Sequence, residues 1–259
     1  MRKSFILGAA VAMAAAMPAL AGDLKVGATP VPHAEMLEHV KPALKDLGVN
    51  LEIVEFNDYV QPNLATADGS IQANFYQHKP YLDSFVEEHK VDLVSVAGIH
   101  IEPMGLYSSK IKKLEDLKEG AKIGIPNDPT NGGRALLLLA RHNVITLKNA
   151  DDIKSTVPDI AKNDKKLQFV ELEAAMLPRS LNDVDAAVIN TNYAMGANLN
   201  PLKDAIVIED STSPYVNVIV TTSKNSDNGD IKKLVDALRS PATKQFITDK
   251  YKGAVVPAF

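Results

Sequence analysis

Short, nearly continuous apolar runs alternate with segments of helical periodicity from residue 24 onward, and this alternation limits the fold more than any other feature. Each run is short enough for a strand and fits one buried on both faces, as in a parallel sheet. Helical segments at 33–48, 131–142, 174–182 and 228–239 would cover the sheets. The predicted strands are LKVGAT, NLEIVEF, DLVSVAGI, AKIGIP, LQFVELE, DAAVIN and VNVIVTT. The sequence therefore predicts an α/β fold with open sheets.

Two interruptions of this rhythm predict two lobes rather than one large sheet. Residues 98–120 depart from the earlier pattern, and EDSTSPYVNVIV near 210–220 offers a second crossing between lobes. Two crossings and a C-terminal return predict a first lobe from 22–104 plus 214–259 and a second from 105–213. Because clefts between domains are preferred ligand sites, we expect a ligand cleft between the lobes.

The first 21 residues have the pattern of a cleavable signal peptide. Positive residues 2–3 precede the apolar stretch FILGAAVAMAAAM, and ALA at 19–21 fits a cleavage site. The apolar stretch is short for a membrane anchor, and no later segment resembles a span of about 20 apolar residues. We expect export and cleavage after Ala21. The cleavage region also resembles a lipoprotein signal, but Asp23 stands where the lipidated cysteine would be.

Composition and motifs favour a binding protein over an enzyme. Cleavage removes two cations and no acids, so the formal charge falls from -4 to -6, which argues against nucleic acid and anionic membranes as partners. The chain has no cysteine, which excludes disulfides, thiolate metal sites and cysteine nucleophiles. It also lacks G-x-G-x-x-G after the first strand, Gly-Lys-Ser/Thr, H-E-x-x-H and G-x-S-x-G. We therefore expect no cofactor and no catalytic residues.

The histidines indicate no metal site. His33 and His39 lie six residues apart and would not share one helix face, and no local pair of metal ligands stands out. A site assembled from residues distant in sequence stays open. The chain's histidines are His33, His39, His78, His89, His100 and His142.

Aromatic residues concentrate in two stretches of a chain that has no tryptophan. EFNDYVQPN places Tyr59 just past a predicted strand end, where ligand contacts collect in open α/β sheets. ANFYQHKPYLD crowds Phe75, Tyr76, His78 and Tyr81 together. This cluster could pack into the core at a helix start or form the wall of an aromatic pocket.

Three polar residues lie where a specific partner is needed. Asn190 and Asn217 stand at the end of, or within, apolar runs, and a buried asparagine usually has a backbone or ligand partner. In NDPTNGGRALLLLARH, the residues before Arg134 suggest a loop that feeds a helix. A cation close to the positive N-terminus of a helix is disfavoured unless an anion accompanies it.

Taken together, these blocks resemble the NlpA family, the methionine-binding proteins of bacterial ABC importers. The resemblance covers essentially the whole predicted mature chain, with the blocks in one order. They are VGATPVPHAE, FNDYVQPN, FYQHKPYLD, IPNDPTNGGRALLLL, ELEAAMLPRSL, AVINTNYA and SPYVNVIV.

The resemblance implies a two-lobed periplasmic-binding-protein fold of type II, with L-methionine held between the lobes. Arg134 would take the α-carboxylate bidentately, and Asn190 and Asn217 would hold the α-amino and carboxylate groups. The thioether pocket, where sulfur–aromatic contacts are favourable, would be lined by Tyr59, Tyr76, His78 and Tyr81.

The resemblance also implies a partner and a place in the cell. The protein would act as a periplasmic monomer that delivers L-methionine to a membrane permease, without a lipid anchor because of Asp23. Tyr76 departs from the family, which commonly has Phe at this position, and its hydroxyl could tighten or repolarise the pocket.

Other ligands and one other class of function stay open at this point. D-methionine, a methionine dipeptide or another amino acid would need a changed pocket or amino-group clamp. An exported enzyme on the same scaffold would need an acid or base, and His78 is the best candidate. The sequence neither supports nor excludes a surface adhesin or scaffold role.

Overall fold

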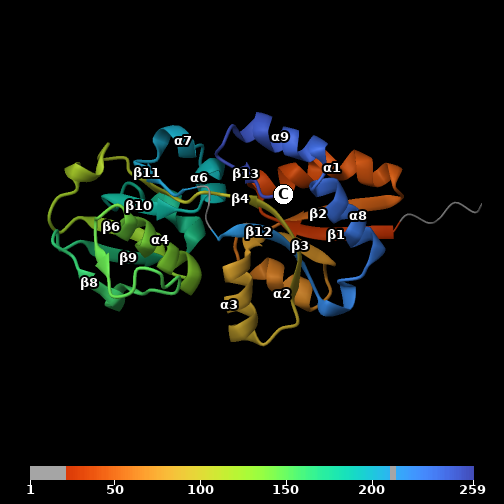
Figure 1. Cartoon of the computed structure of the whole chain (residues 1–259), viewed down its shortest axis with the longest axis horizontal. Helices are drawn as coiled ribbons and strands as arrows, with labels where there is room; N and C mark the ends of the chain where they lie inside the picture. Colours follow the sequence, from red (N-terminus) through yellow and green to blue (C-terminus); the bar gives the residue numbers. More distant parts are fainter. Residues whose placement is uncertain (1–21, 211–213) are drawn as a thin grey trace, which may run out of the picture.

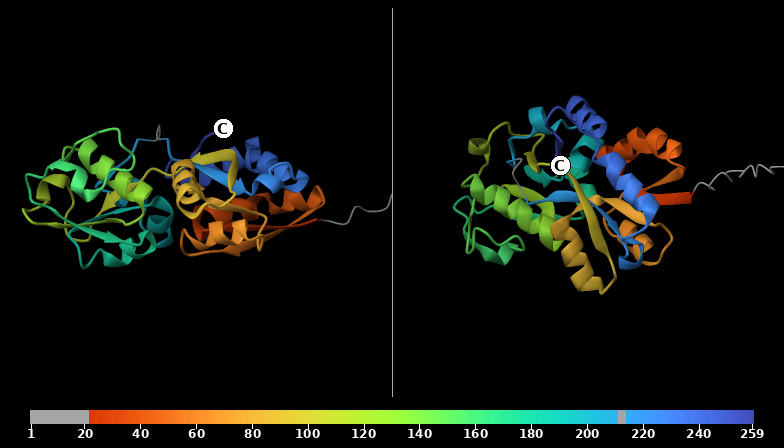
Figure 2. Two further views of the ribbon diagram at one scale, coloured as in Figure 1. Left: turned by 90° about the horizontal axis from the view of Figure 1, so that it is seen from below. Right: turned by 45° about the vertical axis from the view of Figure 1, so that its right-hand side comes forward.

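The computed structural model describes residues 22–210 and 214–259, and the predicted signal peptide lies outside them. Two lobes lie side by side, each built around its own sheet (Figure 1). Figure 2 shows the same division from two further directions. No helix in the described ranges is long and apolar enough to cross a membrane.

The first lobe contains a six-stranded sheet. Its strand order is β13 (Val256–Pro257), β4 (Val94–Ile101), β12 (Val216–Thr221), β3 (Ala73–His78), β1 (Gly22–Ala28) and β2 (Val49–Glu55). Its helices are α1 (Glu35–Asp46), α2 (Gln61–Ala67), α3 (Lys79–His89), α8 (Gly229–Leu238) and α9 (Pro241–Tyr251). α1, α8 and α9 contribute to the apolar core on one face, while α3 packs with Tyr76 and Val218 on the other.

The second lobe contains a five-stranded sheet. Its strand order is β11 (Val207–Ile208), β5 (Gly105–Tyr107), β10 (Ala186–Ile189), β6 (Lys122–Pro126) and β9 (Gln168–Leu172), and β7 (Thr146–Leu147) pairs separately with β8 (Ile160–Lys162). Its helices are α4 (Pro129–Arg141), α5 (Leu177–Ser180), α6 (Thr191–Gly196) and α7 (Pro201–Asp204). The leucines of α4 fill the core on one face, and residues of α5 and α6 pack on the other.

The sheets are mixed, so the expectation of parallel sheets was wrong for the strands next to the crossings. β1 pairs in parallel with β2 and β3, but β12 is antiparallel to β3 and β4, and β5 is antiparallel to β10 and β11. The chain leaves the first sheet after β4 and returns to it at β12. Because β4 runs toward the crossing and β12 runs away from it, these two neighbouring strands must be antiparallel.

Strand β3 lies in the middle of the first sheet, where the sequence analysis expected no strand. All six of its residues are buried, but Asn74 and Gln77 interrupt its apolar pattern. Their side chains are satisfied by Asn63 and Thr66 of α2: Asn74 Nδ2 donates to Thr66 Oγ1 at 2.7 Å, and Gln77 Nε2 donates to Asn63 Oδ1 at 2.6 Å. A buried amide network thus replaces the apolar signal of a strand.

Helix α4 begins two residues earlier than predicted, so the glycine pair lies inside the helix and not in a loop before it. Asp128 is the N-cap, and its carboxylate accepts from the backbone N–H of Asn131 at 2.9 Å. A Cβ on Gly133 would collide with the backbone carbonyl of Ile153. The glycine therefore permits the close approach of a neighbouring loop. The predicted helix 174–182 is shorter than expected, a 3₁₀ turn followed by the four residues of α5.

Candidate functional site

A cavity lies between the lobes. Its lining comes from both lobes and from the first crossing, and it includes all seven residues singled out in the sequence. The lining residues are Tyr59, Tyr76, Gln77, His78, Tyr81, Glu102, Asn131, Arg134, Asn190, Thr191, Asn192 and Asn217. A cavity between two lobes is a preferred place for a small ligand.

Arg134 of α4 is 2% exposed and its guanidinium already has an anionic partner. Nε donates to Glu209 Oε1 at 2.8 Å and Nη2 to Glu209 Oε2 at 2.5 Å, while Nη2 also donates to the Glu102 carbonyl at 2.8 Å. The bidentate partner is thus a protein carboxylate. Nη1 makes no hydrogen bond to the described residues, so it is the end of the guanidinium left for a ligand. The guanidinium also lies over the Tyr215 ring, 4.2 Å from its centroid.

Glu209 joins the two segments in which the chain crosses between the lobes. It follows β11, and its Oε2 accepts from the backbone N–H of Met104, which lies between β4 and β5, at 2.9 Å. The Glu209 backbone N–H donates to the Met104 carbonyl at 2.9 Å. Burial opposes the charge of Arg134, but Glu209 outweighs it and the pKa of Arg134 is raised. The ion pair therefore holds both crossings and orients the arginine.

Three tyrosines form one wall of the cavity. The Tyr76 and Tyr81 hydroxyls both donate to the Tyr59 carbonyl, at 2.7 and 3.0 Å. The Tyr59 ring lies 5.8 Å from each of the other two rings. The Tyr76 hydroxyl therefore bonds to backbone, which leaves ring surface for an apolar ligand group.

His78 has both ring nitrogens in use. As the N-cap of α3, its Nδ1 accepts from the backbone N–H of Tyr81 at 3.1 Å, so Nε2 carries the proton and donates to Asn131 Oδ1 at 3.0 Å. Burial, with a further effect of Arg134, lowers the pKa of His78 to about 3. A neutral imidazole with no nitrogen free is poorly suited to general acid or base catalysis.

The two predicted asparagines present opposite groups to the cavity. Asn190 donates through Nδ2 to Asn131 Oδ1 at 2.8 Å, and its Oδ1 is buried without a partner among the described residues. Asn217 accepts at Oδ1 from His33 Nε2 at 3.0 Å. Its Nδ2 makes no hydrogen bond within the described ranges. Asn190 thus offers an acceptor and Asn217 a donor.

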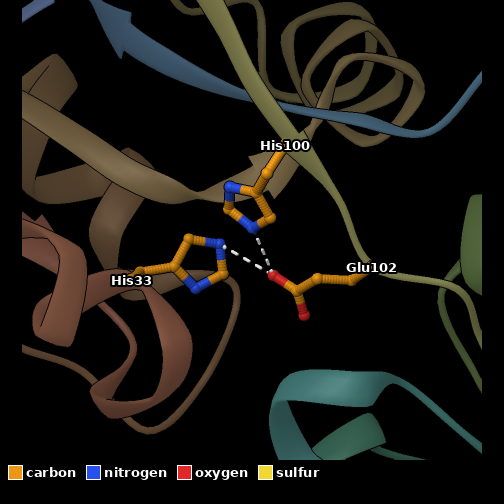
Figure 3. A group of neighbouring side chains, drawn as sticks. All are labelled: His33, His100 and Glu102. Carbon is orange, nitrogen blue, oxygen red and sulfur yellow. Dashed lines mark hydrogen bonds and ion pairs between the residues drawn. The ribbon is translucent and has the colours of Figure 1, made fainter. Parts of the chain in front are cut away.

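Glu102 and the two buried histidines beside it were not among the predicted site residues (Figure 3). His100 Nε2 lies 2.7 Å and His33 Nε2 3.2 Å from Glu102 Oε1. His100 in β4 and Glu102 just after it are two residues apart, a local pair that could have been found from the sequence. The potential metal-ligating atoms of these three residues lie within 4.8 Å of one another.

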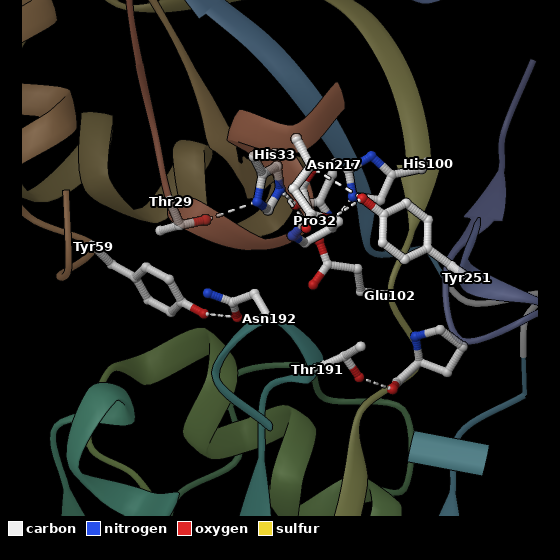
Figure 4. Close-up of polar contacts among 12 residues, drawn as sticks. Thr29, Pro32, His33, Tyr59, His100, Glu102, Thr191, Asn192, Asn217 and Tyr251 are labelled. Atoms are coloured by element: carbon white, nitrogen blue, oxygen red, sulfur yellow. Dashed lines mark hydrogen bonds and ion pairs between the residues drawn. The ribbon is translucent and has the colours of Figure 1, made fainter. Parts of the chain in front are cut away.

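Hydrogen bonds account for this cluster without a metal (Figure 4). His33 Nδ1 accepts from Thr29 Oγ1 at 2.7 Å, and the Nε2 atoms of His33 and His100 point at Glu102. His100 Nδ1 has no partner among the described residues, whereas a metal-bound imidazole almost always donates its second N–H. We assign no metal to this cluster, and the expected absence of a metal site stays a prediction.

Direct contacts hold the lobes together around the cavity. The Tyr59 hydroxyl donates to Asn192 Oδ1 at 2.6 Å (Figure 4), and the Tyr193 hydroxyl donates to the Asn57 carbonyl at 3.2 Å. At the surface, Lys154 pairs with Glu87 at 3.0 Å. These bonds join residues from different lobes, so this is a closed arrangement.

Comparisons with known proteins agree with this architecture. A family model described as NlpA lipoprotein matches residues 24–259. Over 236 residues the chain is 44% identical to the D-methionine-binding lipoprotein MetQ of Escherichia coli strain K12, covering 90% of this chain and 87% of that protein. A nutrient binding protein from Burkholderia cenocepacia, solved bound to methionine, is 50% identical with a TM-score of 0.88, covering 91% of this chain and all of that one. The crystal structure of the methionine binding protein MetQ is 43% identical with a TM-score of 0.89, covering 92% and 98%.

Proposed function

Because the chain belongs to the NlpA lipoprotein family, we propose that it captures L-methionine in the periplasm and delivers it to the permease of an ABC importer. As a member of a family of substrate-binding proteins, it is not an enzyme. The observation that carries the proposal is the cavity between the lobes, which is lined by a guanidinium, two amides and a tyrosine wall. A similar protein solved with methionine supports it.

The polar and apolar ends of the cavity match the two ends of methionine. Arg134 Nη1 and Asn217 Nδ2 are the donors for the α-carboxylate. Tyr59, Tyr76 and Tyr81 present ring surface, and contacts between a thioether sulfur and aromatic rings are favourable.

The lobes, 22–104 plus 214–259 and 105–213, move about the two crossings. A ligand that contacts both lobes binds the closed form more tightly than the open form and so shifts the population toward closure. The permease then recognises the closed form of a monomeric binding protein. The sequence contains no cysteine, which supports a form without a thioether-linked lipid.

D-methionine is the second candidate, because the names of several relatives specify it. The two enantiomers share every chemical group, and they differ only in where the α-hydrogen and side chain lie relative to the polar clamp. A methionine dipeptide is the third candidate, because the cavity would have to hold one more residue.

Isothermal titration calorimetry on residues 22–259, unfolded and refolded to remove bound ligand, tests the proposal. L-methionine, D-methionine and a methionine dipeptide are titrated in turn. One-site binding of L-methionine at micromolar Kd or tighter, with weaker binding of the others, is expected. Refolded protein that gives no heat with L-methionine would refute the assignment, and tighter binding of D-methionine would replace the L-enantiomer by the second candidate.

A further inference from the structure

The chain contains two Asn-Gly steps, Asn131-Gly132 and Asn228-Gly229. An asparagine that precedes glycine is prone to lose its side-chain amide, because glycine has no Cβ to crowd its own backbone nitrogen. That nitrogen can then attack the side chain of the asparagine before it. The structure places the two steps in different surroundings, so their reactivity should differ.

The first step is protected by helix α4 and by burial. Asn131 is 1% exposed, and Gly132 is also buried. The backbone N–H of Gly132 donates to the Asp128 carbonyl at 2.8 Å, and Asn131 Nδ2 donates to the Asp128 carboxylate at 2.9 Å. Asn131 Oδ1 accepts from His78 and Asn190. Attack at this step therefore requires α4 to unwind within the core of its lobe, and such an opening has a high free energy.

The second step lies at the surface, where α8 begins. Asn228 and Gly229 are both exposed, and Asn228 has an extended backbone with φ -60° and ψ 127°. Among the described residues, the Gly229 N–H and the Asn228 Nδ2 group have no hydrogen-bond partner. Asn228 Oδ1 accepts from the backbone N–H groups of Asp230 and Ile231, at 2.8 and 3.2 Å. Fraying of one exposed helical turn breaks both of these bonds.

We propose that Asn228 is a site of spontaneous deamidation in the folded protein and that Asn131 is not. In the first step of the reaction, the Gly229 backbone nitrogen bonds to Asn228 Cγ and the bond from Cγ to Nδ2 breaks. The amide leaves as ammonia with the proton that the Gly229 nitrogen gives up. Water then opens the cyclic imide at either of its carbonyls, which gives aspartate or isoaspartate. The chain and water are the only reactants.

The two products should differ in stability. Aspartate keeps an oxygen for the two capping bonds and adds a negative charge where a helix begins, which is favourable. Isoaspartate carries the main chain through the side-chain carbon, so the capping bonds are lost. Helix α8 places Ile231, Leu234 and Leu238 in the core of the first lobe. Isoaspartate should therefore loosen this lobe, while the cavity between the lobes keeps an intact Asn131.

The test follows folded residues 22–259 during incubation at mildly alkaline pH, which favours the deprotonated nitrogen. Trypsin releases the two steps in separate peptides, 123–134 and 225–232. Mass spectrometry with fragmentation then locates the change from amide to acid, relative to the sample before incubation. Peptide 225–232 should convert at Asn228, and peptide 123–134 should stay unmodified. In urea both peptides should convert, because the fold no longer protects Asn131.

Two variants test the chemistry of the step. Gly229→Ala should fold as wild type does, because a Cβ at this position meets no atom within 4 Å. It should convert several-fold more slowly, because the Cβ crowds the attacking nitrogen. Asn228→Ser keeps a capping oxygen without an amide, so its peptide should not change with time.

Three results would overturn the inference. The first is conversion of Asn131 as fast as Asn228 in the folded protein. The second is a folded protein in which Asn228 stays intact for as long as Asn131 does. The third is an unchanged rate in Gly229→Ala, which would show that the Gly229 nitrogen is not the attacking group.

Discussion

Removal of Arg134 should destabilise the protein as well as abolish binding, because its partner is buried. The side chains of Arg134 and Glu209 are 3% and 2% exposed. Arg134→Ala leaves the Glu209 carboxylate without its cation, and breaking a buried ion pair in this way costs about 3–5 kcal/mol. For a chain of this size, that corresponds to a fall in Tm of about 6–20 °C.

The double variant Arg134→Met/Glu209→Gln separates the two effects. It removes both charges, keeps similar volumes, and retains an oxygen for the Met104 N–H that Glu209 accepts. Replacing both members of a buried pair is often nearly neutral, so its free energy of unfolding should lie within about 1 kcal/mol of wild type. It should still not bind methionine. Arg141→Ala, at the exposed end of α4, is the control and should change neither quantity.

Urea unfolding of ligand-free protein, followed by circular dichroism, measures the stabilities, and calorimetry measures binding. An Arg134→Ala variant that loses less than about 1 kcal/mol would show that the pair contributes little in the ligand-free protein. A double variant no more stable than the single one would show that the two residues are not coupled. Either result would contradict the buried-pair reasoning.

Three further outcomes follow from the packing and the burial. Gly133→Ala should lower the free energy of unfolding by about 1–3 kcal/mol, because the added Cβ would collide with backbone atoms. Gly196→Ala is the control and should not destabilise the protein, because no atom lies within 4 Å of the added Cβ. Urea midpoints of the two variants and of wild type test this. Tyr59→Phe removes a hydrogen bond between the lobes. Methionine affinity, measured by calorimetry, should therefore fall about 2- to 13-fold. An unchanged Kd would show that this bond does not support closure. Burial lowers the pKa of His78 to about 3, so below pH 6.5 the unfolded chain binds a proton that the folded chain does not. Stability should therefore fall as pH decreases from 6.5 toward 3, by up to about 1.4 kcal/mol per pH unit for this residue; urea midpoints at pH 7, 6 and 5 should show a shallower slope in His78→Gln.

The parts of the fold that depend on local pattern could be predicted from the sequence. The apolar run VNVIVTT was expected to be a strand, and β12 confirms it. Its antiparallel direction could not be predicted from the run itself, because direction depends on where the chain re-enters the sheet. Strand β3 was not predicted because Asn74 and Gln77 interrupt its apolar pattern. Their hydrogen-bond partners lie on α2, outside the strand.

The candidate site, too, could be predicted only where it depends on local sequence pattern. The seven predicted residues all line one cavity, since they lie near the ends of recognisable elements and in family-like blocks. The partner of Arg134 lies 75 residues away in the chain, and no local spacing connects the two. Glu102 could have been predicted, because it lies two residues after His100 in the sequence, but only the structure places His33 beside them.

The position of β12 between β3 and β4 has a consequence for the order in which the chain folds. Within the described residues β4 pairs with β12 and β13, so until residues 216–221 have been made it has no neighbour in its sheet. All the strands of the other sheet lie within 105–208. During synthesis, the middle of the chain can therefore complete its lobe before the lobe that contains β1. The lobe begun first is the one finished last, which keeps a nascent chain incompletely folded until its C-terminus is available.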